Sequence, residues 1–575
     1  MKRRSAKFLL LVLVFVMITA LAAGCRRNDP DTIEIFGKAG VGEIGLLEGW
    51  FGKMIMDEFD MVINQISAPD GNNHLLWDTR SMAGHLGDLI IVDPEDFQEL
   101  IDAGLILDLT DWVNSTYMPY YTSQFPQGVA RARNIGNGRI WGIPTVQSSQ
   151  APGSPLLDGD RIQRAPYLRQ DLYFAIGAPP INTLEDLPGV LAQMRDLQPT
   201  LPDGRPVYGF TLWGAWCNGQ TALANVLWFD QMYGMRQWGQ TGSIDPINQT
   251  FESLLDPNGY YRRVLKMYFE ANQLGLIDPD SATQGDDLIW GKVADGQVLF
   301  SWYSWFGPGG FNNNERDAEG IGMTFTPIMD QTLLVPSIPV DGEGNSLLAI
   351  GSGTEDPERL IRFLDWLANP DTFQAIHAGP EGLTWEMVNG EPVITEFGIA
   401  AGMADQARVD DVPVPEEWGG GDFVLGSWGN PSLILRWRGL EINPNTGFTY
   451  DPRHWPSLAA TGASRVQSEW SNHYGFATMP QFLEAHNMIA TEPIVTASWD
   501  WPARPDHLDI VFGEVAGITW NNAWRMIFAD SAADFDAIWD DTVATVMGLG
   551  WQELEDWERS IADQYFAHVN AYLGR

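Results

Sequence analysis

Aromatic side chains offer the most distinctive chemistry in this sequence of 575 residues, which contains 25 tryptophans beside 27 phenylalanines and 15 tyrosines. Most of these rings are expected in a large hydrophobic core. An excess of indole rings also suits the recognition of sugars, because the C–H face of a sugar lies flat on an aromatic ring while its hydroxyl groups need polar partners. Each ring alone is explained equally well by either role.

The sequence lacks the residue patterns of common catalytic sites. HExxH, GxSxG and the P-loop order GxxxxGK[ST] are absent, and the glycine-rich stretch 37–49 leads to Trp50-Phe51 rather than to a lysine. The eight histidines are scattered without ligand spacing, and Cys217 is interpreted as a small apolar packing residue. Paired carboxylates could serve a glycosidase, but among 75 acidic residues such pairs are uninformative. We therefore predict no enzyme activity, no metal ion and no cofactor.

The N-terminal stretch predicts export. Four basic residues precede the apolar run Phe8–Met17, and small residues then lead to Cys25. The ending Leu21-Ala22-Ala23-Gly24-Cys25 is similar to a bacterial lipobox, whose cysteine receives a diacylglycerol with acyl chains such as palmitate. We expect a lipoprotein signal peptide over 1–24, lipidated Cys25 and a linker to 31, and an extracytoplasmic protein anchored to the cell membrane. An ordinary cleaved signal and an uncleaved anchor are the alternatives.

Charge and cysteine content narrow the classes of partner. The formal net charge is −41, and removal of residues 1–24, which carry four positive and no negative charges, leaves −45. So acidic a chain argues against nucleic acid and against polyanionic ligands, which need a basic surface. Cys25 and Cys217 are the only cysteines, so neither a disulfide framework nor a cysteine metal cluster is expected.

The elements that must position these side chains alternate between strand and helix. Strands are predicted at 32–36 and 61–66, and residues 85–92 are predicted to be a loop that enters a buried strand, with helices at 50–59 and 97–103. This alternation is typical of a mainly parallel α/β sheet. The chain is too long for one core, so two or more lobes are expected.

Several segments together resemble an extracellular solute-binding protein of an ABC importer, in the carbohydrate-type group that includes maltose-binding protein. The order "GDLIIVDPED", "LIDAGLILDLTDWV", "GRIWGIP" and "LRQDLYFAIGAPPINTLEDL" is similar to the first half of that family. Later matches are "GLIDPD", "WGKVADGQVLF", "SLLAIGSGTEDPERLIRFLDWLANPD" and the two terminal helices. From about 398 to 530 the resemblance thins.

The resemblance implies a fold class and domain boundaries. The expected fold is a two-lobed, periplasmic-binding-protein-like (Venus-flytrap) α/β fold, with a hinge between two mainly parallel or mixed sheets flanked by helices. Lobe 1 is expected over 32–145, with about 308–345 returning to it, and lobe 2 over 146–307. Residues 346–575 are expected to continue lobe 2, with C-terminal helices and an insertion at about 398–530.

The resemblance also implies a function without chemistry on the ligand. Such a monomer captures an oligosaccharide between its lobes by hinge closure and delivers it to the transmembrane subunits of an ABC permease. A peptide or another non-sugar solute, and a surface-anchored glycoside hydrolase or lyase, remain alternatives. Trp302 and Trp305 rank highest as ligand-binding residues, because aromatic residues at the end of this strand often face the ligand in the family. The other candidates are Tyr303, Trp213, Trp216 and Trp385, with Asp88, Gln147 and Asp171 as polar partners.

Overall fold

The computed structural model describes most of the chain beyond the N-terminal stretch. The described residues are 30–38, 45–68, 73–93, 96–145, 147, 162, 164–214, 224–336, 346–403, 412–423, 441–461, 464–492 and 502–572. Cys25, Trp216 and Cys217 lie outside them. The chain divides into two compact units: a first unit of Met1–Leu107, Leu347–Phe363 and Pro413–Asn430, and a second unit of Asp108–Ser346, Leu364–Val412 and Pro431–Arg575.

The first unit is built on a mixed sheet with strand order β2-β3-β1-β4-β13. Its central strands β1, β3 and β4 are parallel, whereas the outer strands β2 and β13 run antiparallel to their neighbours. The bounds are β1 Asp31–Gly37, β2 Gly45–Leu46, β3 Met61–Ile66, β4 Leu89–Val92 and β13 Leu347–Ile350, with helices α2 Gly49–Phe59, α3 Asn73–Met82 and α4 Phe97–Asp102. The strands and helices predicted for this part of the sequence are therefore confirmed to within one or two residues.

Two contacts join distant segments of the first unit. Helix α2 buries Trp50, whose indole Nε1 donates to the carbonyl of Phe423 at 3.1 Å, and the two rings stack with centres 5.7 Å apart. The carboxylate of Asp88 accepts from the backbone N–H of Glu34 at 2.9 Å and from the hydroxyl of Thr354 at 3.2 Å. Asp88 therefore organises the end of the sheet.

The second unit contains a three-stranded antiparallel sheet of order β10-β6-β11, formed by β6 Arg164–Arg169, β10 Phe300–Tyr303 and β11 Met323–Phe325. Parallel bridges add the segments around Tyr208 and Ile277, which continue the layer beyond β10. Most of the buried core of this unit surrounds this layer. In this core, helix α10 (Tyr260–Gln273) contributes Tyr268 and Phe269.

Three smaller sheets and many helices complete the second unit. Its sheets are β7-β8-β9, β12-β16 and the hairpin β14-β15. The bounds of their strands are β7 Arg236–Trp238, β8 Gly242–Asp245, β9 Thr250–Ser253, β12 Leu333–Pro336, β14 Trp385–Val388, β15 Glu391–Ile394 and β16 Ile489–Glu492. Strand β5, Ile143–Pro144, belongs to none of these three sheets. The helices are α5 Pro119–Gln124, α6 Pro126–Ile135, α7 Gln170–Ala175, α8 Leu187–Leu197, α9 Ala224–Leu227, α11 Asp286–Asp295, α12 Pro308–Phe311, α13 Asn314–Glu319, α15 Pro370–Ala378, α16 Glu396–Ala400, α17 Pro456–Thr461, α18 Arg465–Tyr474 and α19 Met479–Ala485. Helix α14, Pro357–Leu367, begins in the first unit and ends in the second.

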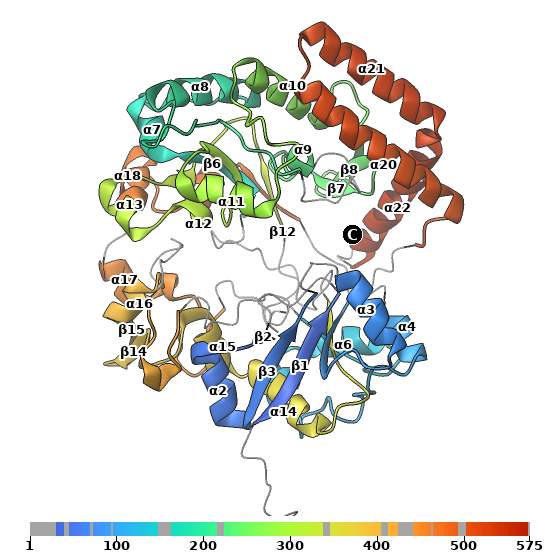
Figure 1. Ribbon diagram of the computed structural model, residues 1–575, viewed down its shortest axis with the longest axis vertical. Helices are drawn as coiled ribbons and strands as arrows, with labels where there is room; N and C mark the ends of the chain where they lie inside the picture. Colours follow the sequence, from blue (N-terminus) through green and yellow to red (C-terminus); the bar gives the residue numbers. More distant parts are fainter. Residues whose placement is uncertain are drawn as a thin grey trace, which may run out of the picture. The chain divides into compact units, whose positions relative to one another are not determined.

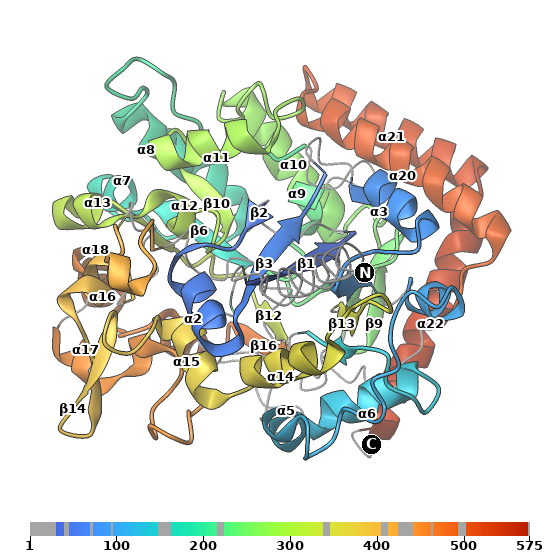
Figure 2. The same cartoon turned by 60° about the horizontal axis from the view of Figure 1, so that its bottom comes forward.

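Three long C-terminal helices pack together, namely α20 Asp506–Ile527, α21 Ala532–Gly548 and α22 Trp551–Tyr572. Helices α20 and α21 lie side by side in both views (Figure 1, Figure 2). Helix α22 is fixed to the sheet β7-β8-β9 by Glu558, whose buried carboxylate accepts from the backbone N–H groups of Gln240 and Thr241 at 2.8–3.1 Å. Gly239 makes this approach possible, because a Cβ atom there would lie 2.2 Å from the carboxylate carbon of Glu558.

The terminal helices agree with the sequence prediction, whereas the expected return of residues 308–345 to lobe 1 does not. Asp356 accepts from the backbone N–H of Arg359 at 3.1 Å and so caps α14. Helix α20 was not predicted, because it lies where the resemblance thins. Within 308–345, β11 pairs with β6 of the second unit, and it is β13 that pairs with β4 of the first unit. The other lobe boundaries stay predictions. Among the described residues, no helix is long and apolar enough to cross a membrane.

Candidate functional site

A group of aromatic side chains meets where strand β10 ends in the second unit. Trp305 is its centre, with ring centres 4.9 Å from Tyr303, 5.7 Å from Trp290 and 6.2 Å from Trp213. Tyr303 in turn meets Trp228 at 5.2 Å, edge to face. We call this group the β10 cluster; its members are Trp213, Trp228, Trp290, Tyr303, Trp305 and Phe306.

Exposure separates the two rings that the sequence ranked highest. Trp305 is only partly buried. Trp302 is 0% exposed: its ring packs against Trp228, and its indole Nε1 donates to the hydroxyl of Tyr268 at 2.9 Å. The structure therefore places Trp302 in the core, with no accessible surface, and leaves Trp305 as the more exposed of the two residues.

A guanidinium group adjoins the rings. Arg164 starts β6, directly opposite Tyr303 in the register of the two strands. Its Nε donates to the Tyr303 hydroxyl at 2.9 Å, and its Nη1 lies 3.4 Å from the buried carboxylate of Asp230. A half-buried indole, a phenol and a guanidinium at one strand end can stack on a sugar face and donate hydrogen bonds to its hydroxyl groups.

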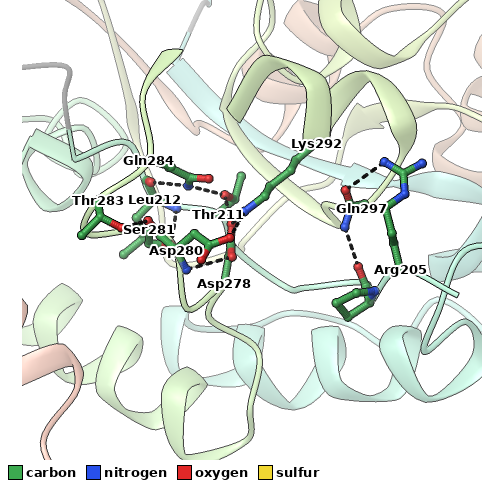
Figure 3. A network of polar contacts seen from close by, with 11 residues as sticks. Arg205, Thr211, Leu212, Asp278, Asp280, Ser281, Thr283, Gln284, Lys292 and Gln297 are labelled. Atoms are coloured by element: carbon green, nitrogen blue, oxygen red, sulfur yellow. Dashed lines mark hydrogen bonds and ion pairs between the residues drawn. The ribbon is translucent and has the colours of Figure 1, made fainter. Parts of the chain in front are cut away.

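The backbone leading into Trp213 is held by a network of buried side chains (Figure 3). Gln284 donates through Nε2 to the carbonyl of Leu212 at 2.9 Å and to the hydroxyl of Thr211 at 2.7 Å. The N–H of Leu212 donates to the hydroxyl of Ser281 at 2.9 Å. The N–H of Trp213 donates to the side-chain oxygen of Asn225 at 2.8 Å. Since successive backbone groups are bonded, the position of the Trp213 ring is fixed.

An ion pair completes this network. Lys292 extends from α11 and donates to Asp278 at 2.7 Å and to Asp280 at 2.9 Å (Figure 3). The same oxygen of Asp278 accepts from the Thr211 hydroxyl at 2.7 Å, and Asp278 is fully buried. Burial opposes the charge on Lys292, but hydrogen bonds to the two carboxylates outweigh this effect and raise the pKa of its ammonium group. The pair thereby ties α11 to the strand end that carries Trp213.

The structure does not bring the remaining predicted site residues to the β10 cluster. Trp385 is buried in a separate core with Trp455, and its Nε1 donates to the carbonyl of Gly379 at 2.9 Å. Gln147 is 0% exposed and donates to Pro144 and Tyr121. Asp171 forms a two-point ion pair with Arg169 at 2.7–2.9 Å.

Asp88 and Trp216 are the remaining candidates. Asp88 belongs to the first unit, where the contacts described above occupy its carboxylate. Trp216 lies outside the described residues, so its role stays a prediction. Of the candidates, the β10 cluster unites Trp213, Tyr303 and Trp305.

Sequence reasoning missed Arg164, Asp230 and Trp290. Arg164 and Asp230 are 66 residues apart, and no local pattern links them. Trp290 is the first residue of the segment "WGKVADGQVLF", which resembles the solute-binding family. Its place in that segment could have marked it as a candidate. Within the described ranges, no group of three or more His, Cys, Asp or Glu side chains could hold a metal ion.

The fold is that of the extracellular solute-binding proteins. One solved structure with this fold is an extracellular solute-binding protein from Bifidobacterium longum subsp. infantis, 13% identical, which aligns over 94% of this chain and 98% of that chain with a TM-score of 0.56. The substrate-binding protein FusA of an S. pneumoniae ABC transporter, in complex with kestose, is 15% identical over 93% of this chain and 100% of its own, with a TM-score of 0.54.

A third similar structure is the alginate-binding protein AlgQ2 without calcium ion, 14% identical over 93% of this chain and 98% of its own, with a TM-score of 0.53. All three are binding proteins by description. No family model and no curated protein matches the sequence. At these identities the likeness establishes the fold, and it confirms the two-lobed α/β class predicted from the sequence.

The Lys292–Asp278 pair predicts a large stability effect. We expect Lys292→Met to cost about 3–5 kcal/mol of unfolding free energy, because it leaves a buried carboxylate without its counter-charge. The double variant with Asp278→Asn should lose less than the two single losses added together. Chemical denaturation measures each value. The exposed pair Lys53–Asp57 is the control; a loss for Lys292→Met no larger than for Lys53→Met would contradict this role.

Asp230 predicts a pH dependence of stability. Burial raises its pKa from 3.8 to about 6, although Arg164 opposes this shift. Between these values the folded protein keeps a proton that the unfolded chain has lost, so stability falls as pH rises from about 4 to about 6. At about 1.4 kcal/mol per pKa unit, the fall is on the order of 2–3 kcal/mol.

Denaturation of the Asp230→Asn variant across this pH range tests the assignment. Because the amide stays neutral, the variant should lose this part of the pH dependence. Glu185 is the opposite control: a hydrogen bond from Arg263 lowers its pKa to about 2, so Glu185→Gln should lose stability at neutral pH. An unchanged pH profile for Asp230→Asn would count against the raised pKa.

Proposed function

We propose that this protein is the substrate-binding component of an ABC importer and that it captures an oligosaccharide at the β10 cluster. The observation that carries this proposal is the half-buried Trp305, whose ring meets the ring of Tyr303, while the Tyr303 hydroxyl accepts from Arg164, in a fold shared with substrate-binding proteins. FusA was solved with kestose and AlgQ2 is an alginate-binding protein, so proteins with this fold bind saccharides.

The chemistry of the cluster fits a saccharide better than a peptide. A flat ring accepts the C–H face of a pyranose or furanose, and the neighbouring N–H and O–H groups donate to its hydroxyl oxygens. A peptide in extended form is commonly bound through main-chain hydrogen bonds to an exposed strand edge. In the described sheet, β10 pairs with β6 on one side and bonds the segment of Tyr208 on the other. The start of β10 therefore has a backbone partner on both sides.

Binding requires no reaction on the ligand. In the proposed mechanism the ligand contacts both lobes and favours a closed state in proportion to its higher affinity for that state. The permease then recognises the closed form of the monomer. The sequence contains no P-loop, so ATP hydrolysis is assigned to a separate subunit.

The N-terminal sequence supplies the proposed location. We assign a signal peptide to residues 1–24 and a lipid anchor to Cys25, which places the protein outside the cytoplasmic membrane beside its permease. A tether raises the effective concentration of the binding protein at its partner. Membrane fractionation of a Cys25→Ser variant tests this part of the proposal separately from ligand binding.

Capture without turnover is the central prediction. Purified protein should melt at a higher temperature with at least one member of an oligosaccharide panel, since a ligand at 100 times its Kd adds about 2.7 kcal/mol of stability. Chromatography of the same mixtures should recover the saccharide intact. Released product would instead identify a glycoside hydrolase or lyase, and the absence of any thermal shift across the panel would remove the saccharide assignment.

Two tryptophans three residues apart should respond differently to removal. Trp305→Ala should weaken saccharide binding roughly tenfold, because it removes an accessible stacking face worth about 1.4 kcal/mol, and leave folding intact. Trp302→Ala should cost about 3–5 kcal/mol of stability, because it opens a cavity in the core. Calorimetric titration and denaturation measure the two effects. Wild-type affinity in Trp305→Ala would move the site away from the β10 cluster.

A further inference from the structure

Arg164 is the positive charge that lies against the rings of the β10 cluster. Its guanidinium carbon lies 5.4 Å from the centre of the Tyr303 ring, and its side chain is 28% exposed. A guanidinium has five N–H donors. In the described part of the chain, its Nε donates to Tyr303 and its Nη1 donates to Asp230. Its remaining N–H groups can therefore donate to a ligand beside Tyr303.

The positive charge of Arg164 is balanced by the carboxylate of Asp230. This carboxylate is 1% exposed and lies 3.4 Å from the guanidinium. Backbone N–H groups of Gln231 and Gln237 donate to its two oxygens at 2.5 Å each, so the carboxylate is fixed in place. Because both of its oxygens are engaged, the carboxylate stays beside Arg164 and offsets the charge of Arg164 when it is ionised.

The second cation near Asp230 is balanced in the same way. Arg236, on β7, forms an ion pair of 2.9 Å with Glu492 on β16, whose side chain is 5% exposed. Tyr260, on α10, also interacts electrostatically with Asp230 and carries no positive charge. Among the described residues, the two arginines that interact with Asp230 each have a carboxylate partner, within a chain whose net charge is −41.

We infer that the site takes neutral oligosaccharides and discriminates against those that carry carboxylates, such as uronates. This inference rests on the proposed function and specifies its ligand class. Arg164 serves as a hydrogen-bond donor to hydroxyl groups, while Asp230 cancels the attraction that an anionic sugar needs to offset the loss of its hydration. The negative charge of the whole chain adds a repulsion that salt screens.

Matched pairs of saccharides test the inference on the unmodified protein. Each pair shares linkage and length and differs only at C6, as β-1,4-mannotetraose and β-1,4-tetramannuronate do; glucose and galactose pairs extend the panel. Calorimetric titration at neutral pH should show that the neutral member of any bound pair binds at least about tenfold more tightly, or 1.4 kcal/mol. A uronate that binds as tightly as its neutral partner would overturn the inference and leave oligosaccharide capture standing.

Asp230→Asn removes the compensating charge and keeps the size of the side chain. In this variant the affinity for the uronate relative to that for its neutral partner should rise at least about fivefold at low salt, and this gain should disappear at about 0.5 M salt. Arg164→Gln is the counterpart and should weaken both members of a pair. An equal relative affinity for the uronate in wild type and Asp230→Asn would overturn the role of Asp230.

The panel also separates the inference from the proposed function. If no saccharide of either kind binds the wild-type protein, oligosaccharide capture fails, and the preference fails with it. If saccharides bind but the uronates prevail, only the preference fails. Circular dichroism and melting of both variants exclude misfolding as the cause of any change.

Discussion

The register between β6 and β10 is the constraint on which the candidate site depends. Antiparallel pairing sets Arg164 directly opposite Tyr303, so that the guanidinium meets the phenol of the neighbouring strand. The register shifts between Ser301 and Tyr303, and this irregularity precedes the turn that carries Trp305. A slip of one residue would move each side chain to the other face of the sheet and dissolve the cluster.

Buried charges hold this arrangement in place at considerable cost in hydration. Lys292 with Asp278 fixes the segment that ends in Trp213, and Asp230 fixes Arg164. A buried pair is rarely a net source of stability compared with an apolar replacement. Here each pair positions a segment of the cluster. Asp278 holds Thr211, two residues before Trp213, and Asp230 holds Arg164 against Tyr303.

The fold was more predictable from the sequence than the site. Local periodicity can be read directly from the sequence. It accounts for the alternation of strand and helix over residues 31–66, for the helix that Asp356 caps and for the terminal helices. The different burial of Trp302 and Trp305 cannot be predicted in this way, because it depends on whether a residue distant in sequence, such as Tyr268, packs against the ring. The acids Asp88 and Asp171 are both engaged by neighbours in space, and the pairing of Arg164 with Asp230 spans 66 residues. Contacts between residues so far apart in the sequence cannot be predicted from the sequence alone.

The contact between Gly239 and Glu558 links two positions more than 300 residues apart. A side chain at 239 would occupy the volume that the Glu558 carboxylate now fills, and loss of that carboxylate would leave the N–H groups of Gln240 and Thr241 without their acceptor. Neither position can change alone without a penalty. In the evolutionary history of this chain the two positions are therefore expected to covary: a relative with a residue larger than glycine at 239 should carry a shorter side chain at 558 and another means of attaching its last helix.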